Sequence, residues 1–75
     1  MTSDGIEREV LEEIGKHLLL KKEELVRFLE NKVENPVSIA EAVTKTLNGQ
    51  GLITYVSPFG HSCFAITQKG MREIL

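Results

Sequence analysis

The chain is poor in cysteine and has no long apolar run. Cys63 is its only cysteine, which excludes an internal disulfide framework and suits a reducing compartment. No run of about 18 apolar residues occurs, so the sequence predicts no membrane-spanning helix. The segment MTSDGIEREV at the start lacks the basic and apolar regions of a signal peptide. We therefore expect a soluble, cytoplasmic protein that does not enter a membrane.

Residues suited to catalysis or metal binding are also scarce. His61 and Cys63 share one face of an expected strand, but zinc prefers four ligands, and otherwise only His17 is available, in an unrelated helix. The adjacent carboxylates of Glu12-Glu13 and Glu23-Glu24 splay around a helix instead of facing one another. A phosphate-binding glycine loop is missing as well. We predict no enzymatic activity, no metal site and no cofactor.

The length of the chain bounds its size and stability. Its 75 residues predict one domain, spanning residues 1–75, without internal repeats or low-complexity segments. Such a domain buries only about 60–65% of the surface that its unfolded chain exposes. We expect a modest core and a free energy of unfolding on the order of 4–11 kcal/mol.

Charge is distributed unevenly along the chain. The formal net charge is −2, and nine of the 11 carboxylates lie in residues 1–34. From Ala42 to Arg72 there is none. Because carboxylates repel phosphates, this stretch is permissive for contact with nucleic acid. A small hairpin with much buried surface would also carry few charges, so the pattern has two readings.

Two amphipathic helices are expected in the first half of the chain. Asp4 and Glu7 have the D-x-x-E spacing of a helix start, so the first helix should begin at Asp4. Gly15 marks either an early end of this helix or a close helix contact. The second helix should run from Lys21 to Lys32. The expected inward residues of the two helices are Ile6, Val10, Leu11, Ile14 and Leu18, then Leu25, Val26, Phe28, Leu29 and Val33.

A third helix is expected after the turn around Pro36. Ser38 and Glu41 have the S-x-x-E spacing of a capping box, although Asn35 could cap the helix with Pro36 as its first residue. Ile39, Val43 and Leu47 recur every four residues and form an apolar stripe. Asn48-Gly49 should end the helix, because glycine takes the left-handed conformation at little cost.

A β-hairpin and a short helix should follow. Leu52–Val56 and Ser62–Thr67 alternate in the manner of strands. Ser57-Pro58-Phe59-Gly60 fits a type I turn between them. Thr67 can then cap a last helix over residues 68–75.

This succession resembles the winged helix-turn-helix family, particularly small bacterial and archaeal regulators of the MarR and PadR kind. The resemblance covers nearly the whole chain, and its most specific parts are LNGQGLI (Leu47–Ile53), the hairpin, and ITQKG (Ile66–Gly70). It implies an α+β fold: a winged helix-turn-helix with a three-helix core, a C-terminal β-hairpin wing and a short last helix. In the family a brief strand pairs with the wing. Leu18–Leu20 would supply it here, although the segment also fits the tail of the first helix.

The resemblance also implies a sequence-specific transcriptional regulator that binds double-stranded DNA, with a second copy of the chain in a homodimer as a further expected partner. The helix over residues 38–48 would enter the major groove, and the hairpin over residues 55–64 would act as the wing. In a major groove, Thr can touch a thymine methyl, Asn can bridge adenine, Lys can reach guanine or phosphate, and Glu can accept from cytosine. The candidate DNA-binding residues are Ser38, Glu41, Thr44, Lys45 and Asn48 on the helix, His61 in the wing, and Lys69 and Arg72 on the last helix.

A second hypothesis is a winged-helix module that docks a protein partner. Wings that grip the minor groove usually carry Arg or Lys near the tip, and Ser57–Ser62 carries neither. Phe59 in this turn would suit a protein contact if it is exposed, or it could fold back onto the sheet. The sequence leaves both orientations open.

Overall fold

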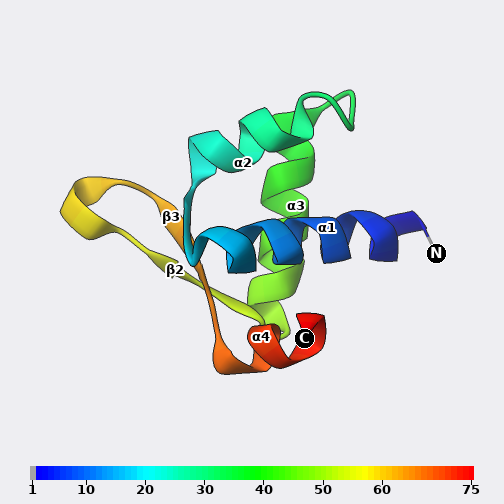
Figure 1. The fold of residues 1–75 in the computed structure, drawn as a ribbon. Helices are drawn as coiled ribbons and strands as arrows, with labels where there is room; N and C mark the ends of the chain where they lie inside the picture. Colours follow the sequence, from blue (N-terminus) through cyan, green and yellow to red (C-terminus); the bar gives the residue numbers. More distant parts are fainter. Residues whose placement is uncertain (1) are drawn as a thin grey trace.

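The computed structural model describes residues 2–75, with side chains from Gly5 onward. It is an α+β structure with four helices and a three-stranded antiparallel sheet. Three helices pack together, α4 lies beneath them, and the hairpin projects to one side, away from the N-terminus (Figure 1). The elements are α1 (Thr2–His17), β1 (Leu19–Lys21), α2 (Lys22–Leu29), α3 (Pro36–Gly49), β2 (Ile53–Val56), the 3-10 turn η1 (Pro58–Gly60), β3 (Cys63–Ile66) and α4 (Gln68–Ile74).

The sheet has the order β1-β3-β2. Tyr55 pairs with Phe64 across β2 and β3, and Leu20 pairs with Phe64 across β1 and β3. The segment after α1 is therefore a strand and not the tail of the helix. Leu18 makes the corner with a φ of 64° and is 63% exposed, so its expected inward position is wrong. The chain must turn sharply there to bring β1 alongside β3.

One apolar core lies between the helices and the sheet. Its largest fully buried side chains are Ile14, Leu25, Leu29, Ile53 and Val10. The helix periodicity thus identifies the buried faces of α1 and α2 correctly, apart from Leu18. Burying one such side chain contributes about 1.5–3 kcal/mol, so these few residues account for much of the stability of so small a domain.

Helix α1 differs from the expectation at its start and confirms one reading of its glycine. It begins at Thr2, so the expected cap at Asp4 is wrong, and Asp4 lies inside the helix. A Cβ on Gly15 would come within 2.7 Å of Ile74 Cδ1 and 2.9 Å of Ile66 Cδ1. Gly15 therefore permits the close approach of α4 and β3 and does not end the helix.

Helices α2 and α3 meet at a turn set by proline. Helix α2 ends at Leu29, three residues before the expected Lys32. Helix α3 begins with Pro36, and Asn35 is its N-cap position. The expected capping box of Ser38 and Glu41 is therefore wrong, because proline suits the first helical position and starts the helix earlier.

The C-terminal end of α3 is a Schellman motif. Leu52 N–H donates to Leu47 O at 3.0 Å, and Gly51 N–H donates to Asn48 O at 3.0 Å. Gly51, with a φ of 77°, is the left-handed residue. The helix ends at Gly49 as expected, but the left-handed glycine is two residues farther on. The motif sends Leu52 back beside Leu47 in the core and starts β2.

The hairpin turn is not type I. Phe59 takes a left-handed conformation, with a φ of 54° and a ψ of 31°, and Gly60 follows with a φ of 81°. A type I turn needs a φ near −90° at the position of Phe59. The paired strands end at Val56 and Cys63, so residues 57–62 form the loop, and two successive left-handed residues reverse the chain within it. This conformation costs a non-glycine residue roughly 1–2 kcal/mol.

Thr67 caps α4, as its position before the helix predicts. Its Oγ1 accepts from Gly70 N–H at 3.0 Å and donates to Gly51 O at 2.7 Å. One hydroxyl thus joins the start of α4 to the end of α3.

Replacing Thr67 with alanine is expected to lower the free energy of unfolding by about 1–2 kcal/mol, because both hydrogen bonds are lost. Urea denaturation of the purified protein would measure the change. Thr67→Ser keeps the hydroxyl and should stay close to wild type. Equal stability of the alanine and serine variants would contradict the assigned cap.

Candidate nucleic-acid interface

The exposed side of α3 and the hairpin face each other across a hollow of about 340 Å³, here called the α3–hairpin hollow. Glu41, Thr44 and Lys45 line it from α3, and Lys22 lines it from the start of α2. Tyr55 lines it from β2 and packs against Phe64, with ring centroids 5.5 Å apart. Residues far apart in sequence therefore share one surface. Two exposed residues of the expected DNA-binding site, Glu41 and Lys45, lie on it.

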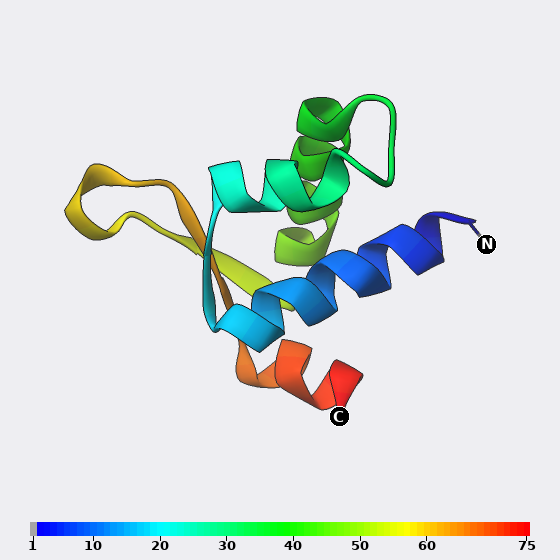
Figure 2. The same ribbon diagram turned by 45° about the horizontal axis from the view of Figure 1, so that its top comes forward.

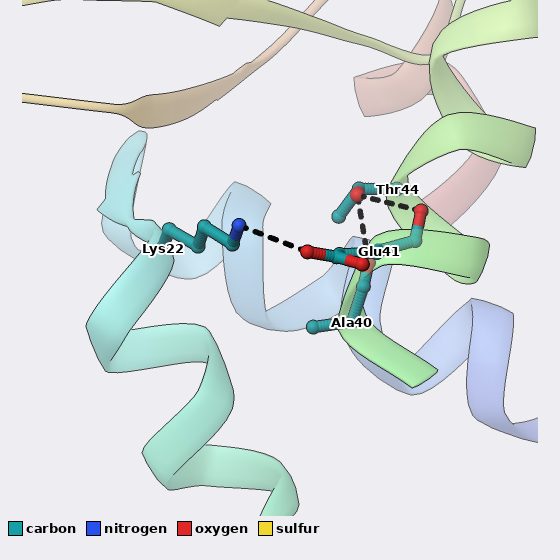
Figure 3. Close-up of polar contacts among 4 residues, drawn as sticks. All are labelled: Lys22, Ala40, Glu41 and Thr44. Carbon is teal, nitrogen blue, oxygen red and sulfur yellow. Dashed lines mark hydrogen bonds and ion pairs between the residues drawn. The ribbon is translucent and has the colours of Figure 1, made fainter. Parts of the chain in front are cut away.

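Thr44 does not fit the expected base contact. The residue is only 2% exposed, and its Oγ1 donates to Ala40 O at 2.7 Å (Figure 3). The buried face of α3 is formed by Ala40, Val43, Thr44 and Leu47, while Ile39 is only partly buried. The predicted stripe is therefore confirmed at Val43 and Leu47, but the buried face is wider than the stripe and also includes Ala40 and Thr44. An alanine and a back-bonded threonine gave no apolar signal that could have corrected the prediction.

Glu41 points toward α2 and pairs with Lys22. Lys22 Nζ lies 3.2 Å from Glu41 Oε2, and the two side chains are 43% and 60% exposed (Figure 3). An ion pair this exposed is worth only about 0–1 kcal/mol, so a ligand can displace it at little cost. Glu41 is thus available to a partner, and Lys22 becomes available when Glu41 turns away.

Lys45 and Ser38 are the other exposed candidates on α3. Lys45 has no ion pair within residues 5–75. Asn48 is different, because its Nδ2 donates to Ile53 O at 3.1 Å and ties the end of α3 to β2. Of the five α3 candidates, Ser38, Glu41 and Lys45 face solvent, whereas Thr44 and Asn48 hold the structure together.

His61 is exposed beside the hairpin tip, close to the start of α2. It lines a second hollow of about 280 Å³ together with Lys21, Lys22 and Glu23. Sequence distance hides this neighbourhood, because about 40 residues separate His61 from the two lysines. The hairpin brings them together through the pairing of Lys21 with Cys63 and the bond from Lys22 N–H to Ser62 O at 3.1 Å.

Lys69 and Arg72 lie on α4, apart from the α3–hairpin hollow. Lys69 Nζ donates to Gln50 O at 2.9 Å, which places it at the C-terminal end of α3. Arg72 lines a separate shallow surface with Gln68 and Met71. The structure therefore brings Lys69 near one end of α3 and does not bring Arg72 to the residues around Lys45.

Phe59 does not fold back onto the sheet. It is 99% exposed at the tip of the hairpin, which extends beyond the helices in both ribbon views (Figure 2). The sequence left this orientation open, and the left-handed turn decides it.

Within residues 2–75, no helix combines the length and apolar character needed to cross a membrane. Over the same part of the chain, His, Cys, Asp and Glu side chains do not gather in groups of three that could hold a metal ion.

Comparison with family models, curated proteins and solved structures finds no match to this chain. Its function has to be inferred from its own residues and their arrangement.

Proposed function

We propose that the chain is a winged helix-turn-helix protein that binds double-stranded DNA and regulates transcription. In this proposal α2 and α3 form the helix-turn-helix, α3 enters the major groove, and the β2–β3 hairpin is the wing. The observation that carries it is the α3–hairpin hollow, where Lys45 has no ion-pair partner among residues 5–75 and Lys22 has only an exposed one. A major groove about 12 Å wide accepts a helix, and the flanking phosphates attract these cations.

The exposed residues have distinct proposed roles. Ser38, Glu41 and Lys45 face the base edges, where hydroxyl, carboxylate and ammonium groups recognise different bases. Lys22 and Lys69 neutralise phosphates on either side of α3, and His61 approaches the backbone beside the wing. Arg72 is a peripheral phosphate contact. Thr44 and Asn48 position α3 from inside the protein.

A second candidate function is docking of a protein partner through the wing. Phe59 favours it, because a fully exposed aromatic ring is unusual on a protein that has no partner. The net charge of −2 also favours such a module, because a DNA-binding domain is expected to be more cationic.

Fluorescence anisotropy of a labelled random-sequence duplex, titrated from ~20 to 200 mM salt, separates the two functions. About three phosphate contacts per monomer predict a log–log slope of roughly −3 against salt, and a dimer roughly twice that. Sedimentation of the same samples gives the oligomeric state. If the folded protein does not bind at the lowest salt concentration, DNA binding is rejected and the docking function is favoured.

A further inference from the structure

The tip of the hairpin presents one isolated aromatic ring. Phe59 is almost completely exposed, and Pro58 is the one other apolar residue of its loop, since Ser57, Gly60, His61 and Ser62 offer only polar groups or no side chain. Among residues 5–75, the other large exposed apolar side chains are Leu18, Leu19, Val37, Tyr55 and Leu75, and none of them belongs to this loop. Within its loop the ring therefore has a single apolar neighbour, which is less than the apolar surround that seals a protein–protein hot spot from water.

The backbone that carries the ring is held in place. Gly60 N–H donates to Ser57 O at 3.2 Å, and His61 N–H donates to Pro58 O at 3.0 Å. Pro58 fixes the backbone before Phe59, and Gly60 continues the left-handed path after it. Exposure of the ring to water and a left-handed backbone are both unfavourable for phenylalanine. The turn nevertheless places Phe59 in this state. A protruding side chain on an ordered backbone is suited to entering a narrow groove.

The charges around the tip favour nucleic acid as the partner whose groove the ring enters. Residues 57–62 contain no carboxylate, so the tip has no negative charge to repel phosphates. Behind the tip, Lys21 and Lys22 share the second hollow with His61, with Glu23 as the only carboxylate lining it. Cations placed behind an uncharged apolar point can hold the phosphates that flank the point of entry.

We propose that Phe59 is a minor-groove wedge, which inserts its ring between neighbouring base pairs and bends the duplex while α3 lies in the adjacent major groove. This inference rests on the proposed function. Apolar side chains that enter the minor groove unstack a base step and bend the DNA by roughly 20–90°. The wing would thus act by deforming DNA, where an arginine-bearing wing would act by charge.

The size of the molecule permits both contacts at once. Its principal dimensions are 29 × 28 × 20 Å. One helical turn of DNA spans about 34 Å, so half a turn is roughly 17 Å. The longest dimension of the protein therefore exceeds the spacing between neighbouring grooves of one duplex.

The test uses one A·T-rich duplex with a central TA step, because this step unstacks most easily. The probe carries 2-aminopurine at that step, which brightens on unstacking, and a dye at each end, whose energy transfer increases on bending. Anisotropy of one end dye measures binding separately. With wild-type protein at saturation and ~20 mM salt, we expect at least about a twofold rise in 2-aminopurine fluorescence together with increased energy transfer.

Phe59→Ala should still bind, because its phosphate contacts remain, but should lose both deformation signals. Phe59→Leu is the matched control, since leucine also serves as a wedge, and it should keep most of each signal. Phe59 is exposed, so both variants are expected to fold, and circular dichroism checks this. Wild-type binding without unstacking or bending, or unchanged signals with Phe59→Ala, would overturn the wedge and leave DNA binding standing. Absence of binding at ~20 mM salt would overturn both and point to a protein partner for Phe59.

Discussion

Replacing Gly70 with alanine is expected to lower the free energy of unfolding by about 2–4 kcal/mol. Gly70 is buried in α4, and an added Cβ would collide with the carbonyl oxygen of Leu52 and come within 2.8 Å of Ile66 Cγ1. Leu52 O also accepts the hydrogen bond from Thr67 N–H at 3.1 Å. The backbone of Leu52 would have to move, so overpacking of about 1–3 kcal/mol is added to roughly 1 kcal/mol for a weakened hydrogen bond. Urea denaturation measures the sum.

Gly49→Ala provides the matched control for this experiment. Gly49 is the last residue of α3 and is exposed, and an added Cβ would have nothing within 4 Å. Alanine has a higher helix propensity than glycine, so this variant should equal or exceed wild-type stability by up to about 1 kcal/mol. If Gly70→Ala were as stable as Gly49→Ala, the close packing of α4 against the turn before β2 would be wrong.

The order of elements follows from local chemistry, so the sequence predicts it well. The apolar periodicity of α1 and α2, the alternation in the hairpin and the threonine before α4 each act within a few residues. The left-handed residues are harder to locate, because Gly49 and Gly51 both suit the end of α3. Only the packing of Leu52 against the core selects Gly51.

The turn at Phe59 shows the same limit. Its sequence satisfies the composition of a type I turn, but the strand register fixes a longer loop and a different backbone path. Register depends on which side chains of β3 face the core, so it is a property of the whole sheet. A bulky residue with a positive φ gives no signal in the sequence.

The candidate interface was predictable in part. Lys45 and Ser38 are exposed on α3 as the helix pattern predicts. The pair between Lys22 and Glu41 joins residues on different helices, and the burial of Thr44 depends on how α3 is rotated against the core. Sequence periodicity gives that rotation only to within about one residue, since neighbouring positions on a helix differ by 100°.

Charge reversal at Lys45 should have the largest effect on DNA binding. Lys45→Glu would place a second carboxylate on the α3 side of the hollow, one helical turn after Glu41, where the proposal puts base edges and phosphates. We expect the affinity for duplex DNA to fall by about 10–100-fold at ~50 mM salt, with the log–log salt slope reduced by roughly one. Stability should change by only about 0.5 kcal/mol, because both side chains are exposed.

Lys16→Glu distinguishes a local effect from the change in net charge. Both variants shift the formal net charge from −2 to −4. Lys16 is exposed near the end of α1 and lines neither of the two hollows beside the hairpin. Long-range repulsion is screened beyond roughly 10–15 Å at this salt concentration, so Lys16→Glu should weaken binding by less than about threefold. Equal losses of affinity from the two variants would mean that binding depends only on the net charge of the protein. The proposal that α3 enters the major groove would then be wrong. A large loss confined to Lys45→Glu would support α3 as the recognition helix, with the wing and its aromatic tip beside it.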